Sequence, residues 1–297
     1  MPKQNLEEII ESSIMNDLII EKSEIDKFVP VVIINTEKTE LKYHEMILKQ
    51  KSDGFQYIEF VPYSKKIELG NSQVSAYVTQ DQISKLKDYN IDVKAAIVNQ
   101  SIKEMSKGIQ EQFLKAIVGL ASKNKNNTFI DKVFIFFYRL FNKPYIKTFK
   151  IKNSQALHYK IIQESNKIAH RTRRGPADFI ICNLRTANIL QKNWNFVYLA
   201  KSEIKESFRI YSIGKIVNMV VYIDPMMKWN DNTIIVGRKN NTNEPGLHFI
   251  FSEKGTSSFV INNTGASILN LQYALTDIGF NPEHNYSKFV YKTKKDL

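Results

Sequence analysis

The longest run of regularly spaced apolar residues predicts a helix over about residues 97–123. Within it, apolar side chains recur at spacings of three and four, which places them along one face of a helix. These positions are Ile102, Met105, Ile109, Phe113, Ile117 and Leu120. The opposite face carries lysine, glutamate, glutamine and serine, so an ordinary core helix explains the pattern and its length is the distinctive property.

A denser pattern occupies residues 167–190, "KIAHRTRRGPADFIICNLRTANIL". The helical spacing of Leu157, Ile161 and Ile168 predicts an amphipathic helix that runs into this segment. The end of that helix is strongly basic, and its arginines are Arg171, Arg173 and Arg174. Such a concentration of charge favours contacts with carboxylates or phosphates, although a solvated turn explains it equally well.

Gly175 and Pro176 are expected to form a structural turn that ends this helix. A residue that precedes proline is pushed out of the helical conformation, and glycine tolerates backbone angles that other residues avoid. After the turn, the apolar run at residues 179–182 predicts a short buried strand. Asn183 is then a suitable N-cap for a second helix over residues 184–190.

Alternation of apolar and polar residues predicts a long hairpin over about residues 55–79, with its turn at Gly70-Asn71. Ile67 and Leu69 alternate with polar residues before this turn. The alternating positions after it are Val74, Ala76 and Val78. A two-stranded hairpin with so little apolar surface is marginal by itself, so we expect it to lie against its own chain or a neighbouring one.

The first 35 residues predict a helical arm followed by the apolar strand "VPVVII". The most continuous apolar stretch, "VFIFFYRLF" at residues 133–141, is too short to span a bilayer and contains Arg139. We therefore expect a buried strand or helix there. Interfacial contact with a membrane is a minor alternative.

Residues 208–239 predict several strands in succession. The expected order is a strand, a turn at Gly214-Lys215, a fully buried strand over residues 216–223 and a strand over residues 234–236. Further strands are expected in "GLHFIF" and "SILNLQYALTDIGF". Together these patterns predict an α+β fold with one long helix and mostly antiparallel strands.

Length and composition narrow the class of protein. A chain of 297 residues forms one large domain or two smaller ones, and 43% hydrophobic residues suffice for a sizeable core. The net charge of +12 favours polyanionic surroundings, nucleic acid above all, although lysines occur throughout and a generally basic surface explains any single one. Acidic residues near the N-terminus argue against a secretory signal, so we expect a cytoplasmic protein.

The sequence contains no recognisable catalytic, cofactor-binding or metal-binding motif. No G-x-G element or P-loop occurs, and the lone Cys182 lies in an apolar run, where an inert buried thiol is expected. The histidines are scattered without ligand spacing: His44, His158, His170, His248 and His284. We therefore expect no enzyme, no cofactor and no metal, but a binding, structural or assembly protein.

Two segments carry a resemblance to a known family. "ESNKIAHRTRRGPADFIICNLRTANIL" resembles the part of T-even-type tailed-phage major capsid proteins in which a basic Arg-Gly turn leads into a buried strand and a capped helix. "GKIVNMVVYIDPMMKWNDNTIIVGRKNNTNEPGLHFIF" is similar to the downstream stretch of that family, with its "VYVDPYA" and "VGYKG" strands. Departures at residues 176–178 and 238–240, and the lack of room for the large insertion domain, suggest a compact, divergent relative.

This resemblance implies the Hong Kong ninety-seven capsid fold, with an N-terminal arm, an E-loop hairpin, a P-domain built on a long spine helix, and an A-domain. The segments expected are an arm at 1–40, the E-loop hairpin and its flanking strands at 41–92, the P-domain at 93–155, the A-domain at about 156–228, and strands returning to the P-domain at 229–297.

The implied function is self-assembly into hexamers and pentamers of an icosahedral phage head around double-stranded DNA, without membrane. Other implied partners are neighbouring capsid proteins and portal, vertex or decoration proteins, and the location is the virion, assembled in host cytoplasm. Candidate contacts with other subunits or with DNA are Arg171, Arg173, Arg174, Lys65 and Lys66.

Several alternatives stay open at this point. A pentameric vertex protein shares the same fold and motifs, and a cellular nanocompartment shell protein shares the fold but is not expected to carry the Arg-Gly segment. A basic nucleic-acid-binding protein would explain the charge, although no recognition helix or aromatic platform supports it. A nucleic-acid enzyme is weaker still, because no paired carboxylates are evident.

Overall fold

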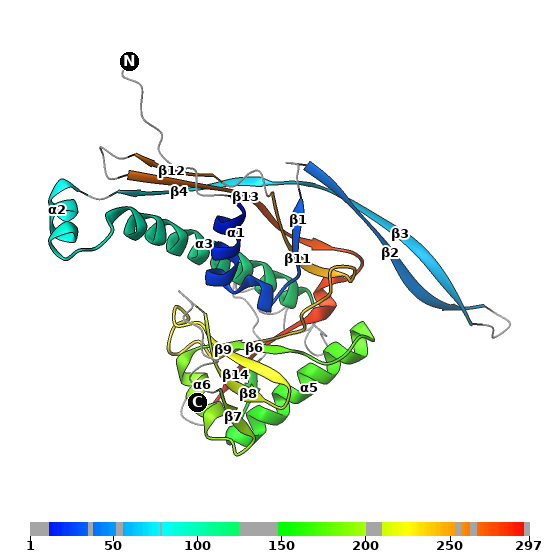
Figure 1. Ribbon diagram of the computed structural model, residues 1–297. Coiled ribbons are helices and arrows are strands. Elements are labelled where there is room, and N and C mark those ends of the chain that lie inside the picture. The colour runs from blue at the N-terminus through cyan, green and yellow to red at the C-terminus, as the bar shows by residue number, and fades with distance from the viewer. Residues whose placement is uncertain are drawn as a thin grey trace, which may run out of the picture. The chain divides into compact units, whose positions relative to one another are not determined.

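A computed structural model describes residues 12–34, 38–51, 56–77, 79–124, 148–199, 210–252, 257–261 and 266–293. The chain divides into two compact units (Figure 1). Unit 1 comprises residues 1–113 and 240–281, and unit 2 comprises residues 114–239 and 282–297. The apolar stretch at 133–141 lies outside the described residues, so its predicted structure stays a prediction. None of the helices in the described ranges is long and apolar enough to cross a membrane.

Unit 1 contains a five-stranded sheet that is organised around β13 (Ala266–Ile278). This strand pairs antiparallel with β4 (Gly70–Tyr77), β11 (Gly246–Ser252) and β12 (Ser257–Ile261). β1 (Val31–Ile34) adds to β11 in parallel. Every residue of β11 is buried. The strands expected in "GLHFIF" and "SILNLQYALTDIGF" are therefore confirmed.

The helices of unit 1 begin with α1 (Ser12–Ser23) and the short η1 (Ile25–Lys27), followed by α2 (Gln80–Asp88). The predicted long helix is α3 (Val93–Lys123), which contributes residues to both units. All six apolar positions predicted for its inner face are buried, from 0% to 5% exposed, which confirms the prediction. The ring of Phe113 packs against that of Phe28 at a centroid distance of 4.8 Å.

The hairpin differs from the one predicted. β2 (Lys38–Gln50) and β3 (Gln56–Glu68) pair antiparallel along all thirteen residues of each strand, and Figure 1 shows them as a long two-stranded ribbon. The chain therefore reverses between Gln50 and Gln56, and the predicted turn at Gly70-Asn71 is wrong. The reason is a long-range pairing: β4 follows β3 after one residue and pairs with β13, with Gly70 opposite Tyr273.

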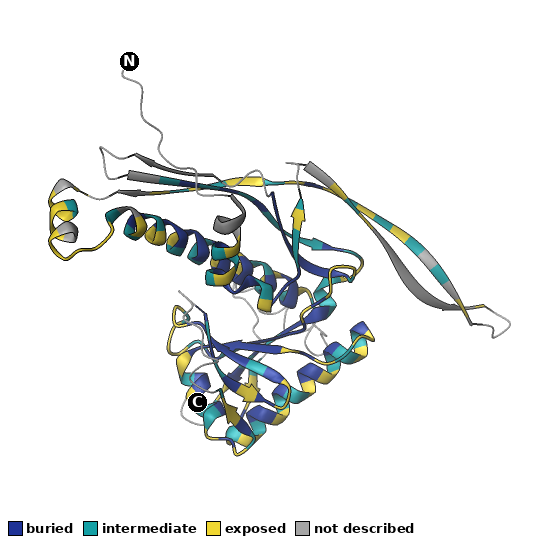
Figure 2. Ribbon diagram, viewed as in Figure 1, coloured by how far each residue is buried: buried dark blue, intermediate teal, exposed yellow. Residues whose placement is uncertain are grey.

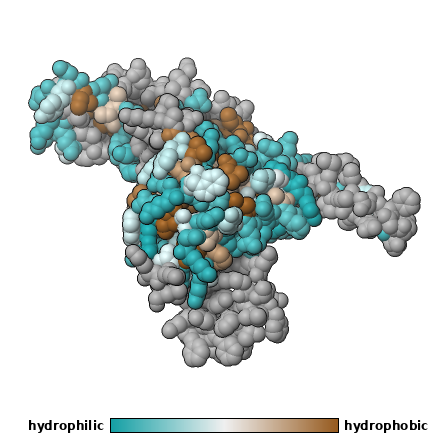
Figure 3. Space-filling view, turned by 90° about the horizontal axis from the view of Figure 1, so that it is seen from below, coloured by the Kyte–Doolittle hydropathy of each residue, from teal (hydrophilic) through white to brown (hydrophobic). Residues whose placement is uncertain are grey.

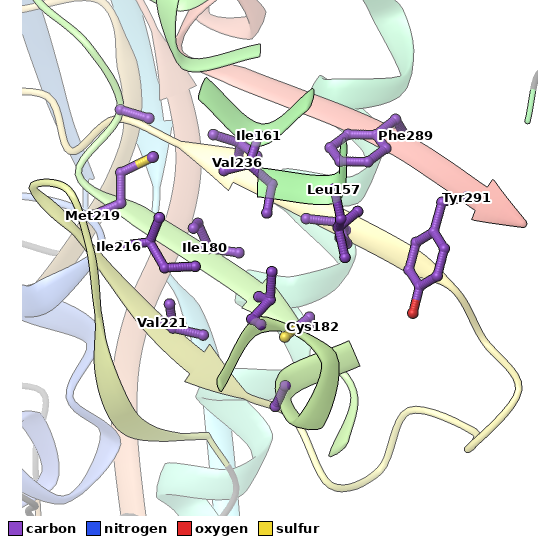
Figure 4. Close-up of a cluster of buried hydrophobic side chains, with 14 of the residues drawn as sticks. Leu157, Ile161, Ile180, Cys182, Ile216, Met219, Val221, Val236, Phe289 and Tyr291 are labelled. Atoms are coloured by element: carbon purple, nitrogen blue, oxygen red, sulfur yellow. The ribbon is translucent and has the colours of Figure 1, made fainter. Parts of the chain in front are cut away.

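Unit 2 is built on a seven-stranded sheet in the order β5-β14-β10-β6-β9-β8-β7. The strands are β5 (Thr148–Lys150), β6 (Phe179–Cys182), β7 (Phe196–Tyr198), β8 (Tyr211–Ile216), β9 (Met219–Ile223), β10 (Thr233–Gly237) and β14 (Tyr286–Lys292). α5 (Ser154–Thr172), α6 (Leu184–Gln191) and the short η3 (Pro282–Asn285) accompany them. Figure 4 shows side chains from α5, β6, β8, β9, β10 and β14 gathered in one buried cluster.

Local patterns in unit 2 predicted its elements well. The amphipathic helix, the buried strand and the capped second helix correspond to α5, β6 and α6, and the side chain of Asn183 accepts a hydrogen bond from the Thr186 amide at 2.8 Å. The turn predicted at Gly214-Lys215 is wrong, because β8 continues to Ile216 and turns at Val217-Asn218. Gly214 is required by packing instead: a Cβ there would lie 2.3 Å from the ring of Phe196.

Candidate functional site

The basic segment at the end of α5 forms a fixed turn. Arg173 adopts the left-handed conformation (φ 57°), and its amide donates to the carbonyl of Ala169 at 2.8 Å, which caps the helix. Gly175 has φ 127°, where any other L-residue would be strained. The Ala177 amide then donates to Ser165 Oγ at 2.9 Å. This bond ties the chain beyond Pro176 back to the helix that it leaves.

The three arginines at this turn have different surroundings. Arg171 is half-buried, and its guanidinium donates to the carbonyls of Tyr286 at 3.2 Å and His284 at 3.5 Å. Burial lowers the pKa of Arg171 from its ordinary value, although the nearby charge of Glu164 opposes this effect. Arg173 and Arg174 are exposed. Arg171 therefore joins α5 to the start of β14, whereas the other two present their side chains at the surface.

A buried carboxylate on α5 was not anticipated from the sequence. Glu164 is 6% exposed and accepts hydrogen bonds from Lys160 and Lys167, each at 2.7 Å, and from the hydroxyl of Ser287 on β14. Burial alone would raise its pKa, but the hydrogen bonds outweigh burial and lower the pKa of Glu164 to about 2. The lysines at i−4 and i+3 were visible in the sequence, but the contact from β14 was not.

A shallow hollow of about 510 Å³ runs along the outer face of α5. The described residues that line it all come from this helix: Tyr159, Ile162, Gln163, Asn166, Lys167, His170 and Arg171. These residues include no nucleophile with a neighbouring general base. Within the described ranges, no three His, Cys, Asp or Glu side chains come together in a way that could hold a metal ion. Burial raises the pKa of the Cys182 thiol to about 12, so this cysteine is the inert thiol expected.

The two candidate lysines lie on β3 of the ribbon. Lys65 is half-buried, and its ammonium group donates to the side chain of Asp277 on β13 at 2.9 Å and to its carbonyl at 2.6 Å. Lys66 is exposed and pairs in register with Glu40 on β2. A hydrogen bond from Ser64 and the charges of Lys42 and Lys66 lower the pKa of Glu40.

The base of the ribbon is held in unit 1 by a small apolar cluster around three buried side chains. These are Ile67 of β3, Ile250 of β11 and Ile278 of β13. Val32, Ile34, Leu41, Tyr63, Leu69 and Ala274 pack against them. Tyr63 also meets the ring of Phe280 edge to face, with ring centroids 5.3 Å apart. Together with the Lys65–Asp277 ion pair, this cluster fixes where the ribbon leaves the sheet.

Asn183 does more than cap α6. Its side-chain amide donates to the carbonyls of Lys228, Trp229 and Asp231, at 2.8 to 2.9 Å, while its oxygen accepts the capping bond. The side chain is fully buried. One residue therefore holds both the start of α6 and the loop between β9 and β10. Its position before the helix indicated the first role only.

Comparison with known proteins adds a family and a fold. The model of the family described as major capsid protein Gp23 matches residues 19–250. The capsid of Cyanophage P-SCSP1u is similar in structure, with a TM-score of 0.55 and 9% identity over 91% of this chain and 88% of that one. A virus-like particle from Pyrococcus furiosus is also similar in structure, with a TM-score of 0.51 and 10% identity over 94% of this chain and 98% of that one.

The procapsid of satellite phage P4 gives a TM-score of 0.51 and 11% identity over 100% of this chain and 95% of that chain. No curated protein matches the sequence. At such low sequence identities, the similar structures show only the fold of this chain. The family to which the chain belongs is shown by the match to the family model.

Proposed function

Because the chain belongs to the Gp23 family of major capsid proteins, we propose that it assembles into the hexamers and pentamers of an icosahedral phage head enclosing double-stranded DNA. The chain is a major capsid protein with the Hong Kong ninety-seven fold. Family and fold point to a structural role in the virion rather than an enzymatic one. The capsid fold implies that copies of the chain associate with one another.

The observation that carries the proposal is the ribbon of β2 and β3. Its strands pair along thirteen residues each, but among its described side chains only Ile67 is buried. A two-stranded ribbon is marginal in water unless a further surface covers it. We assign this ribbon as the E-loop, which would lie over a neighbouring subunit and gain its order from that contact.

The charge of the chain supports packaging of DNA. A net charge of +12 favours non-specific binding to phosphates, with a strength that falls as salt is added. Arg173, Arg174 and Lys66 are exposed and suit contacts with phosphates or with carboxylates of a neighbour. Arg171 and Lys65 already bond within their own unit, so we assign them to positioning the turn and the ribbon. Contacts with portal, vertex or decoration proteins and assembly in the host cytoplasm are part of the same proposal. The division of the chain into segments, from the arm at 1–40 to the strands at 229–297, also stays a prediction.

Shortening the ribbon tests the proposal. Residues 46–60 are replaced by Asn-Gly, so that the register pair Glu45–Val61 closes onto a two-residue turn and the anchored base is retained. We expect a soluble subunit that melts cooperatively and forms no closed shells in electron microscopy. The matched control is Asp53→Asn, which creates the same Asn-Gly dipeptide at full length because Gly54 follows.

Each result has a definite meaning. Intact shells from the shortened chain would overturn the assignment of the ribbon, and loss of folding would place the ribbon in the core of the subunit. If the unmodified chain forms pentamers but no hexamers, the alternative function is correct and the chain is a pentameric capsid vertex protein. If it stays monomeric under all conditions that assemble phage capsids, the proposed assembly is wrong.

A further inference from the structure

Unit 2 exposes four large apolar side chains on and beside the strand at one edge of its sheet. We call Trp194, Val197, Tyr198 and Val217 the β7 surface; they are 84%, 63%, 64% and 58% exposed. β7 is the terminal strand of the described sheet, and Phe196 pairs with Ile216 of β8. Trp194 precedes this pair and Val217 follows it, so both lie at the same end of the two strands. Figure 3 shows one face of the molecule, on which small groups of hydrophobic residues lie among hydrophilic ones.

The strand that carries this surface is firmly held. Phe196 is only 7% exposed, and its ring occupies the space that a side chain at Gly214 would need. The ring also contacts that of Tyr198, at a centroid distance of 4.9 Å. Two exposed residues, Val197 and Tyr198, therefore follow a buried anchor on a packed strand. Figure 2 shows exposed residues on β7 beside the buried strands of unit 2.

Val217 adds an independent observation. It sits in the β8–β9 turn with φ 55°, a left-handed conformation in which a β-branched residue is strained and in which glycine or asparagine is usual. Its side chain is also 58% exposed to water. Neither the stability of the subunit nor its solubility explains an apolar, strained residue at this position. Strain retained at an exposed turn points to a function for that side chain.

We propose that the β7 surface docks on a second copy of this chain, against a different surface of that copy. The inference rests on the proposed function, because a capsid subunit must meet other copies and a closed ring requires contacts between unlike surfaces. Trp194 and Tyr198 bring on the order of 300 Å² of side-chain area, a substantial part of the ~800 Å² that each partner buries in a stable interface. Edge strands that stay in water usually carry charge, and β7 carries none.

Tryptophan fluorescence tests this contact directly, because the chain contains only two tryptophans, Trp194 and Trp229. In the Trp229→Phe variant, the emission of Trp194 is measured with acrylamide as quencher, in dissociated subunits and in purified particles. We expect assembly to shift the emission to shorter wavelength and to reduce quenching severalfold. The reciprocal variant Trp194→Phe reports on Trp229, which is 56% exposed, and serves as the matched control.

Particles in which Trp194 stays as accessible as in the subunit would overturn the docking surface and leave the proposed function standing. Absence of any particle from the unmodified chain would overturn both. Protection of Trp194 only after another virion protein is added would assign the surface to that protein instead of a second copy.

Substitutions give a second test, in which the particle yield is expected to fall while the melting temperature does not. Val217→Asn relieves the strained turn, so we expect an unchanged or higher melting temperature together with a severalfold lower yield of particles. Trp194→Ser is expected to lower the yield without changing the melting temperature. Tyr89→Ser removes a side chain that is 77% exposed in unit 1 and should change neither quantity. Normal yields from both Val217→Asn and Trp194→Ser would exclude the proposed contact.

Discussion

Among the described residues, α3 is the longest helix and the ribbon of β2 and β3 is the longest strand pairing, and the two are stabilised in different ways. α3 has 31 residues and buries an apolar side chain at nearly every turn. The ribbon has two strands of thirteen residues, held together by backbone pairing and anchored by a few side chains at its base. Length alone therefore says little about stability. The helix supports the subunit, whereas we propose that the ribbon gains its order from a surface outside it.

Truncating the helix core should have the largest effect. Phe113 is fully buried against Phe28, so Phe113→Ala is expected to lower the free energy of unfolding by about 3–5 kcal/mol. Denaturant unfolding of the purified protein measures the loss. Asn99→Ala, on the exposed side of the same helix, is the control and should leave unfolding unchanged. Equal unfolding of both variants would show that this face of α3 is not core.

Acid should weaken unit 2 through Glu164. Its pKa is lowered from 4.5 to about 2, so its contribution, about 3 kcal/mol, is complete above pH 4.5 and is lost as the pH falls through 2. Glu164→Gln should destabilise the protein at neutral pH and flatten the loss of stability below pH 4.5. Thermal melting across this range measures both effects. An unchanged slope in the variant would contradict the assignment.

The ion pair at the base of the ribbon should matter less for stability. The side chains of Lys65 and Asp277 are 31% and 38% exposed, so Lys65→Met is expected to cost no more than about 1 kcal/mol. Because this pair helps to fix where the ribbon leaves the sheet, the yield of closed shells should fall more than stability does. Lys42→Met, at an exposed position of β2 in the same ribbon, separates loss of charge from loss of the anchor. Equal yields from the two variants would argue against an anchoring role.

The smallest change in stability is expected at the basic turn. Arg173 and Arg174 are exposed, so replacing both with alanine should alter unfolding by no more than about 0.5 kcal/mol. Particles made from this variant are expected to dissociate at lower salt than unmodified particles, as light scattering can measure. Normal yield with unchanged salt resistance would leave these arginines as solvated surface residues.

What could be predicted from the sequence depended on how far away each contact lies in the chain. α5, β6 and α6 follow from spacing, a glycine-proline pair and a capping asparagine, all within about 40 residues. β4 could not be placed in this way, because its partner is residues 266–273 of β13. At Gly70, where the sequence predicted a turn, the chain instead continues from β3, which pairs with β2, into β4, which pairs with β13.

The candidate contacts show the same limit. Their charges were visible in the sequence, but bonds to Tyr286 and Asp277 remove Arg171 and Lys65 from the set of exposed cations. The β7 surface was missed because Phe196, Val197 and Tyr198 form a short apolar run with no sign of which side chain is buried. Only the packing of Phe196 against Gly214 decides that question.

The position of the last strands has a consequence for how the chain matures during synthesis. β13 holds together the sheet of unit 1, and β14 lies between β5 and β10 in the sheet of unit 2. During synthesis, neither sheet can be completed before residues 266–292 have left the ribosome. The ion pair between Lys65 of β3 and Asp277 also cannot form before that point. A nascent chain interrupted before residue 266 therefore lacks the strand on which each of the two sheets depends.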